Sequence, residues 1–233
     1  MKTPVRMLAF VFLAGLLFSC AGAGPADPEA ALRKKIADAY GASGFDQIEA
    51  LRYTFNVRIG DRQISRSWVW EPATDRVLLK SEEGGADYDR GQVGVSNELH
   101  AVDARFVNDN YWFLFPLHVY WDPGAELTDR GTAPLPIGPG VGRRLVVAYP
   151  AGKGYTPGDV YEIFVDEDFR IRQWIYRKGG AAQPTRITTW EDHRRLGPLT
   201  VSLLHRSADE SFRLWFTEVG VKLKGDQLWT EPR

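Results

Sequence analysis

Histidine and acidic side chains are the groups in this sequence that could bind a metal or act in acid–base catalysis. The histidines are His100, His118, His193 and His205. Their spacing gives no HxH or HExxH pair, which is the usual arrangement of metal ligands on one strand or helix. His118 and Asp122 are four residues apart, but Pro116 and Pro123 flank them, so we do not expect one helical face. The sequence therefore predicts no metal site.

The acidic run Asp166-Glu167-Asp168 lies between two segments of alternating apolar and polar residues, where a β-turn is expected. A turn is solvated, so it does not raise the pKa of a carboxyl group for acid catalysis. The sequence contains no Gly-x-Ser-x-Gly and no P-loop, and Gly138-Pro139-Gly140 includes a proline that lacks an N–H for phosphate. We therefore expect no catalytic residues, no cofactor and no enzymatic activity.

The N-terminal segment has the pattern of an export signal. Lys2 and Arg6 precede an apolar run over residues 7–18, which is too short to span a bilayer as a helix. Cys20, the only cysteine, follows in the sequence Leu-Phe-Ser-Cys-Ala-Gly, which resembles a bacterial lipobox. This predicts a signal peptide over residues 1–19 and an acylated Cys20 with a tether over residues 20–27. The alternative is an ordinary secretory signal cleaved within residues 21–24, with Cys20 unmodified.

Acylation of Cys20 would attach the chain to a membrane without a spanning helix. Ala21 follows the cysteine where inner-membrane lipoproteins usually have aspartate, so the resemblance favours the outer membrane. We therefore expect a lipid-anchored protein of the bacterial cell envelope that faces the periplasm.

Aromatic residues are numerous, with eight Trp, nine Tyr and twelve Phe. They either fill a large core or line an apolar cavity for a lipid-like ligand, since such cavities have mostly apolar walls. The cavity candidates are Phe55, Trp68, Trp70, Phe106, Tyr111, Trp112, Phe113, Phe115, Trp121 and Trp174. A formal net charge of -1 argues against a nucleic-acid partner, which requires an excess of cations.

One helix and then mostly strands must position these side chains. Asp27-Pro28 is a typical helix start and Gly41 a typical stop, and Leu32, Ile36 and Tyr40 share one face. A shorter helical turn is predicted over residues 45–50. Apolar residues then alternate with polar ones, which predicts antiparallel strands. The predicted strands cover residues 51–59, 62–71, 76–81, 159–165, 170–177, 185–191, 199–206 and 212–217.

Two segments depart from this pattern. Residues 106–121 are apolar almost all round from Tyr111 onward, and Pro116 predicts a helix of two turns that ends near it. Such a helix has no polar face, so we expect it to be buried or to plug an opening. Residues 132–142 contain three Pro and three Gly, which predicts an irregular loop. Its Leu135 and Ile137 are candidates for contact with a membrane or a partner.

The lipobox, the N-terminal helix and the meander with its apolar insert together resemble the LolA/LolB/LppX superfamily of lipoprotein carriers. The stretches that carry this resemblance are residues 44–59, 108–117, 159–177 and 187–193. The resemblance implies a mainly β fold with some α, a curved antiparallel half-open β-barrel with an N-terminal helix and an apolar helical plug or lid. It implies one such domain over residues 28–233.

The same resemblance implies a function without catalysis. The hollow of the half-barrel would bind a lipid, an acyl chain or the acyl chains of a lipoprotein, and the protein would be a monomer. An apolar protruding loop occurs in the anchored acceptor of this superfamily, and residues 132–142 could correspond to it. The alternative is a structural or regulatory envelope lipoprotein that uses the same fold to bind a protein partner.

Overall fold

The computed structural model describes residues 27–152 and 155–233, in which antiparallel strands form two open sheets. The first has seven strands in the order β10-β11-β12-β1-β2-β3-β4, and the second has five in the order β5-β6-β7-β8-β9. The predicted signal peptide and Cys20 lie outside the described residues. The strands are β1 (Ile48–Ile59), β2 (Arg62–Glu71), β3 (Arg76–Ser81), β4 (Gly84–Asp89), β5 (Glu126–Pro134), β6 (Val141–Ala148), β7 (Val160–Val165), β8 (Ile171–Arg177), β9 (Arg186–Thr189), β10 (Glu191–Leu196), β11 (Leu199–Arg206) and β12 (Phe212–Leu223).

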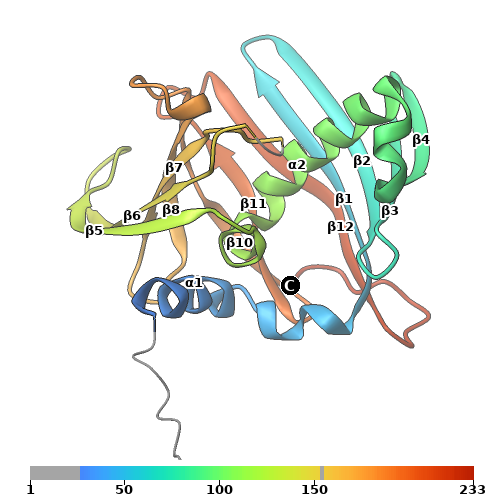
Figure 1. The fold of residues 1–233 in the computed structure, drawn as a ribbon, viewed down its shortest axis with the longest axis horizontal. Coiled ribbons are helices and arrows are strands. Elements are labelled where there is room, and N and C mark those ends of the chain that lie inside the picture. Colours follow the sequence, from blue (N-terminus) through green and yellow to red (C-terminus); the bar gives the residue numbers. More distant parts are fainter. Residues whose placement is uncertain (1–26, 153–154) are drawn as a thin grey trace, which may run out of the picture.

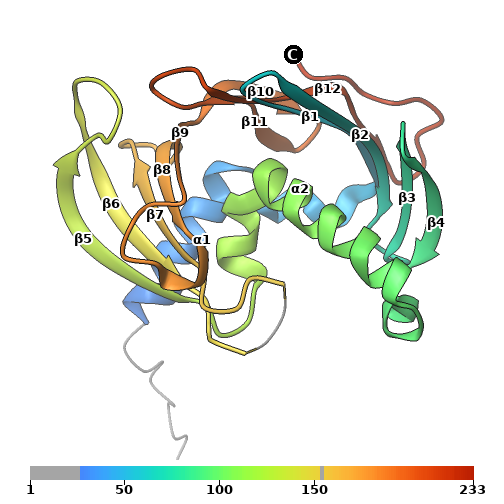
Figure 2. The ribbon, with the colours of Figure 1, turned by 90° about the horizontal axis from the view of Figure 1, so that it is seen from above.

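The two sheets form one curved wall around a long helix, α2 (Asn97–Trp121) (Figures 1 and 2). Neighbouring strands also follow each other in the chain, except that β12 pairs with β1. The sheets adjoin where β9 passes into β10. At this junction the backbone N–H of Arg206, at the end of β11, donates to Thr189 Oγ1, at the end of β9, at 3.0 Å. The expected half-open barrel with an N-terminal helix and a helical plug is therefore confirmed.

Helix α1 (Pro28–Ala39) begins and ends as the sequence predicts. The Asp27 side chain accepts from the Glu29 N–H at 3.0 Å, and Pro28 takes the first helical position. Gly41 then has a φ of 82°, and a Cβ at this position would lie 2.1 Å from the Pro198 carbonyl oxygen. The predicted short helical turn is present but lies earlier than residues 45–50: a 3-10 helix covers Ala42–Gln47, and β1 begins at Ile48.

Strand β1 shows why a single strand can be buried on both faces. Its inward residues Leu51, Tyr53 and Phe55 are at most 2% exposed and pack in the core. On the outward face, Thr54 Oγ1 lies 2.8 Å from Ser67 Oγ on β2 and is itself buried. Cross-strand pairs of this kind stabilise the sheet, so the outward face is polar without being exposed.

The sequence prediction for the apolar insert is wrong in length. Helix α2 starts after Ser96, whose Oγ accepts from the Leu99 N–H at 3.1 Å, and it runs past Pro116 to Trp121. The backbone instead deviates at Leu114, with φ −124° and ψ 19°, because the proline ring disturbs the turn that precedes it. Phe113 and Phe115 are buried on the two sides of this kink, and their packing holds the helix together.

The predicted irregular loop over residues 132–142 is too long at both ends. Strand β5 extends to Pro134 and β6 begins at Val141, so only residues 135–140 form a turn between them. The predicted strand over residues 185–191 is interrupted at Trp190, where the chain leaves one sheet and joins the other. Strands β4, β5 and β6 were not predicted, and of β10 only its first residue, Glu191, was.

Apolar side chains of α2 belong to both hydrophobic clusters of the core. Phe106, Phe113 and Leu117 pack against the seven-stranded sheet, and Phe115 and Val119 pack against the five-stranded sheet. Each large side chain buried in this way contributes about 1.5–3 kcal/mol. Helix α2 is therefore the common core element of the two sheets. Within the described ranges, no helix has both the length and the hydropathy needed to cross a bilayer.

Candidate ligand-binding site

Helix α2 occupies most of the hollow, and two pockets remain along it. The first, which we call the inner groove, has a volume of about 290 Å³ and lies between α2 and the facing ends of the two sheets. Its apolar wall consists of Phe55, Val57, Val107, Trp112, Trp174, Phe212 and Leu214, and its polar groups include Arg66, Asn108, Asp159, Thr185 and Arg186.

Strand register explains why apolar side chains converge on the inner groove. Val57 of β1 is paired with Leu214 of β12, and alternation along both strands directs every second residue to the concave face. From the opposite sheet, the Trp174 ring lies 4.5 Å from the ring of Trp112 on α2. Phe212 lies 5.6 Å from the same Trp112 ring. The groove is therefore an aromatic channel built by three separate elements.

Most polar groups at the inner groove have partners within the protein. Both Arg66 Nε and Nη2 donate to the buried Asp109 carboxylate at 2.7 Å. The Asp159 carboxylate accepts from the Tyr176 hydroxyl at 3.0 Å and from the Gly179 N–H at 2.7 Å. These groups are satisfied, so they shape the wall rather than await a ligand.

The second pocket, which we call the polar pocket after the His118–Asp122 pair in its wall, has a volume of about 650 Å³ and lies on the other side of α2. It shares Val107, Tyr111, Tyr155 and Thr156 with the inner groove. The Tyr155 ring lies 5.2 Å from the His100 ring of α2. The two pockets therefore adjoin where residues 155–156 lie near α2. The other walls of the polar pocket include Trp70, Phe106, Trp121, Arg90, His118 and Asp122.

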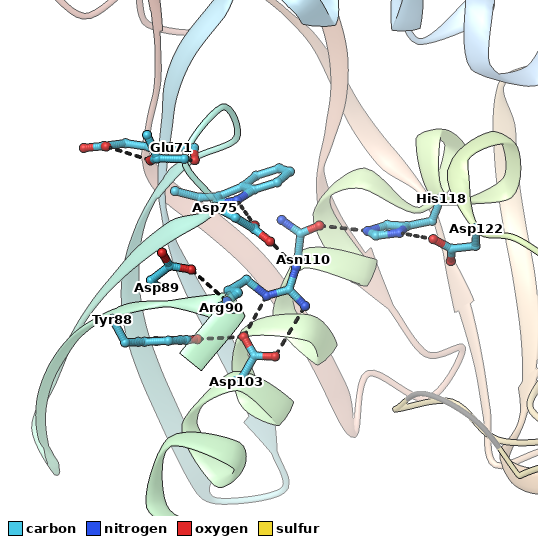
Figure 3. Close-up of polar contacts among 12 residues, drawn as sticks. Glu71, Asp75, Tyr88, Asp89, Arg90, Asp103, Asn110, His118 and Asp122 are labelled. Carbon is cyan, nitrogen blue, oxygen red and sulfur yellow. Dashed lines mark hydrogen bonds and ion pairs between the residues drawn. The ribbon is translucent and has the colours of Figure 1, made fainter. Parts of the chain in front are cut away.

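His118 and Asp122 meet in the polar pocket, contrary to the sequence prediction. His118 Nδ1 lies 3.1 Å from Asp122 Oδ1, and His118 Nε2 lies 2.8 Å from Asn110 Oδ1 (Figure 3). The flanking prolines do not prevent this contact, because α2 continues through Pro116 and Asp122 is its C-cap residue. The ring of His118 also stacks on Tyr111 at 4.2 Å.

Asp122 has three side chains as hydrogen-bond partners, of which His118 is one. Tyr149 donates to its Oδ2 at 2.9 Å, and Tyr111 donates to the same oxygen over a short distance. Burial alone would raise the pKa of Asp122, but the hydrogen bonds from His118, Tyr111 and Tyr149 outweigh it and lower the pKa. Asp122 is therefore held as a carboxylate.

A second carboxylate network lies at the far end of the polar pocket. Asp103 is buried and accepts from Arg90 Nε at 2.8 Å and from the Tyr88 hydroxyl at 2.9 Å (Figure 3). Arg90 Nη1 also lies 3.6 Å from Asp75, which accepts from the Trp70 indole N–H at 3.1 Å. This network attaches the first half of α2 to β4 and to the β2–β3 turn.

The hydrogen bonds of both networks are made within the protein. Both ring nitrogens of His118 are engaged, one by Asn110 and the other by Asp122. Within the described part of the chain, no cluster of three or more His, Cys, Asp or Glu side chains has the arrangement to hold a metal ion. The arrangement is instead suited to hold α2 rigidly.

The structure divides the ten predicted cavity residues into four groups. Phe55, Trp112 and Trp174 line the inner groove, Trp70, Phe106 and Trp121 line the polar pocket, and Tyr111 lines both. Trp68, Phe113 and Phe115 line neither pocket, because they are at most 1% exposed within the packed core. The aromatic residues predicted to line a cavity therefore include both pocket-lining residues and residues of the packed core.

Leu135 and Ile137 do not protrude from the sheet. The β5–β6 turn lies against the β8 strand, where Gln173 accepts from the Ile137 N–H and donates to the Ile137 carbonyl oxygen, both at 2.7 Å. Leu135 and Ile137 are each half-buried in this position. The largest exposed apolar side chain near this turn is instead Val141, which is 69% exposed.

Arg186 was missed by the sequence reasoning, although it is part of the inner groove. Arg186, Thr188 and Trp190 alternate along the predicted strand over residues 185–191. This alternation is a usable signal, because it places Arg186 on the same face as a tryptophan.

No family model matches this sequence, and no curated protein matches it either. Similar folds occur among solved structures. A DUF1329 family protein from Desulfovibrio piger has 10% sequence identity and a TM-score of 0.45, over 83% of this chain and 92% of that one. A LolA superfamily protein from Nitrosomonas europaea has 9% identity and a TM-score of 0.44, over 85% and 97%.

A third similar structure is an outer membrane lipoprotein-sorting protein domain from Vibrio parahaemolyticus, with 9% identity and a TM-score of 0.48, over 85% of this chain and 94% of that one. These descriptions include the superfamily that the sequence resembles. At such low identity the likeness concerns the fold, and it brings no ligand or partner to this chain.

Proposed function

We propose that this protein is a lipid-anchored lipoprotein of the bacterial cell envelope that binds one lipid-like molecule in the inner groove, without catalysis. The observation that carries the proposal is the aromatic channel between the sheets, where Phe55, Trp112 and Trp174 converge beside α2. Its ligand would be a lipid, a free acyl chain or an acyl chain of a lipoprotein. Aromatic and aliphatic walls with polar groups placed beside them are typical of ligand pockets.

The volume of the inner groove limits the size of the ligand. At about 290 Å³ it lies just below the roughly 300–1,000 Å³ found for small-molecule pockets. It therefore suits one acyl chain rather than a molecule with several. Burial of about eight methylene groups would gain roughly 6 kcal/mol, from which the cost of association is subtracted. A larger ligand would have to extend beyond the inner groove.

The anchor and the location are part of the same proposal. Residues 1–19 would be removed as a signal peptide, Cys20 would be acylated, and residues 28–233 would form one periplasmic domain on the outer membrane. The support is the lipobox-like sequence around Cys20. Mass spectrometry of the mature N-terminus should show a diacylglyceryl cysteine, and Cys20→Ser should abolish it. An unmodified peptide that starts after Cys20 would refute the anchor.

Lipid binding is tested by filling the inner groove from α2. Ala104 is half-buried and lines the groove, whereas Ala101 is exposed on the same helix and does not. Ala104→Trp should abolish binding of a fluorescent fatty acid and remove co-purified lipid from native mass spectra. Ala101→Trp is the matched control and should bind as the wild type does. Equal binding by both variants would place the ligand elsewhere, and no binding by the wild-type protein would refute the proposal.

A second candidate function is that of a structural or regulatory envelope lipoprotein that binds a protein partner. The observation that favours it is the packing of α2, which fills most of the hollow with Phe113, Phe115 and Leu117 from within the chain. The fatty-acid titration separates the two functions, because a protein that only binds a partner would bind no amphiphile.

A further inference from the structure

Arg186 places a cation on the concave face of the five-stranded sheet. It is paired with Tyr176 of β8, and two residues further along β9 Thr188 is paired with the buried Trp174. Alternation along the strand therefore directs Arg186 to the same face as Trp174. Its guanidinium carbon lies 4.3 Å from the ring centre of Phe212, which belongs to β12 of the other sheet. The side chain thus extends across the end of the inner groove.

The other half-buried arginines that face the hollow have carboxylate partners, but Arg186 does not. Arg66 is paired with Asp109, and Arg90 with Asp103, at 2.7 and 2.8 Å. Among the ion pairs found within 4.0 Å in the described residues, none includes Arg186. Burial lowers the pKa of Arg186, and the charge of Asp209 only partly opposes this effect. The cost of burying this cation is therefore not offset by an ion pair.

The acidic groups near Arg186 accept hydrogen bonds from hydroxyl and backbone N–H groups and form no ion pair with Arg186 in the described residues. Asp209 accepts from Ser207 Oγ at 2.6 Å and from Ser211 Oγ at 2.8 Å, and these hydrogen bonds lower its pKa to about 2. Asp159, in the wall of the groove, is held by Tyr176 and Gly179. Arg66, the other cation of the groove, is neutralised by Asp109. Among the described residues, Arg186 is therefore the cation of the inner groove that forms no ion pair.

We propose that Arg186 binds the carboxylate or phosphate head group of an anionic amphiphile whose apolar chain lies in the inner groove. This inference rests on the proposed function and adds the charge of the head group and its position. The planar guanidinium offers parallel N–H donors that match the oxygens of a carboxylate or a phosphate. Phe212, Trp112 and Trp174 lie next to it and would contact the first part of the chain.

The test compares ligands that differ only in their head groups. The full chain is expressed in a bacterial host and purified in amphipol, so that no free detergent competes for the groove. Isothermal titration calorimetry at neutral pH then measures binding of decanoate, decyl phosphate and decanol. We expect at least one of the anionic ligands to bind about tenfold more tightly than decanol, because a hydrogen-bonded charge pair at a half-exposed site has roughly that effect.

Substitution of Arg186 then assigns this preference to one side chain. Arg186→Gln should reduce binding of the anionic ligand to the level of decanol and leave decanol binding unchanged, and Arg186→Lys should restore part of the preference. Arg172→Gln, which removes a cation that is 60% exposed on β8, is the matched control and should change nothing.

Each outcome separates this inference from the proposed function. If the wild-type protein binds decanol but neither anion more tightly, or if Arg186→Gln keeps the preference, the assignment of Arg186 is wrong and the lipid site stands. If the wild-type protein binds none of the three ligands, the proposed function itself fails. The wild-type comparison of head groups needs no variant, so it decides the question even if Arg186→Gln does not fold.

Discussion

The buried carboxylate of Asp109 attaches the middle of α2 to the seven-stranded sheet, and its removal should be costly. Arg66 donates two hydrogen bonds to it at 2.7 Å, and the Trp68 indole N–H donates a third at 2.8 Å. The Asp109 side chain is 0% exposed and that of Arg66 is 15% exposed. Asp109→Asn keeps the shape of the side chain but removes the negative charge that pairs with the Arg66 guanidinium. It also replaces one acceptor oxygen by an N–H₂ group, which would face N–H donors of Arg66 or Trp68.

Loss of one partner from a buried ion pair costs about 3–5 kcal/mol of the free energy of unfolding. Because Arg66 retains some contact with water, we expect Asp109→Asn to cost about 3 kcal/mol, at the lower end of that range. Equilibrium unfolding in urea measures this loss. Urea is preferable to guanidinium chloride because it does not screen the charges.

Asp87→Asn is the control for the Asp109 prediction. Asp87 is paired with Arg76 at 2.6 Å, but both side chains are about half exposed, at 51% and 49%. Exposed pairs of this kind contribute little, so this variant should unfold at the same urea concentration as the wild-type protein. If Asp109→Asn is no less stable than Asp87→Asn, the ion pair does not hold α2 against the sheet and our account of the hollow is wrong.

Two further predictions concern the backbone and a buried histidine. Gly41→Ala should destabilise the protein more than Gly60→Ala in urea, because the left-handed backbone costs about 1–2 kcal/mol in both, but only at Gly41 would the Cβ collide with the Pro198 carbonyl. Burial lowers the pKa of His205 to about 3, so the unfolded chain takes up a proton below about pH 6.5 that the folded protein does not. Acidification from pH 7 to about 4.5 should therefore cost roughly 2–3 kcal/mol more in the wild-type protein than in His205→Gln, and equal losses would contradict the burial of a neutral imidazole.

Local patterns predicted the elements whose own residues determine them. Strands β2, β3 and β11 have the predicted bounds, since alternation and short turns define each of them without help from distant residues. The start of α1 was predicted for the same reason, because the Asp27 cap and Pro28 act within one turn. β4 was missed, since its sequence Gly-Gly-Ala-Asp-Tyr-Asp has neither strong alternation nor branched side chains.

Tertiary packing decided the elements that were predicted wrongly. Pro116 locally favours a helix end, but aromatic side chains on both sides of the kink at Leu114 are buried against different sheets, and this burial outweighs the lost hydrogen bond. Pro134 lies in a strand because it ends β5 at the edge of its sheet, where a missing N–H is tolerated.

The candidate site could be predicted only in part. Composition indicated that aromatic side chains would gather in the hollow, but it could not separate Trp112, which lines a pocket, from Phe113, which is enclosed in the core. That difference depends on the rotation of α2 about its axis. The contact of Arg186 with Phe212 depends on two sheets meeting, and no local pattern encodes it.

The pairing of β1 with β12 has a consequence for how the chain reaches its native state. Strand β1 stays without one of its two neighbours until β12, the last strand in the chain, is available. Residues in register, such as Val57 and Leu214, are separated by about two thirds of the sequence. Closing so large a loop is entropically unfavourable, and contacts of this kind make assembly slow. A chain that emerges gradually, from a ribosome or through a membrane pore, therefore cannot complete its seven-stranded sheet before its C-terminal end is free. Until then the hydrogen-bonding edge of β1 that faces β12 is unpaired, and this apolar strand can be bound by chaperones or can aggregate.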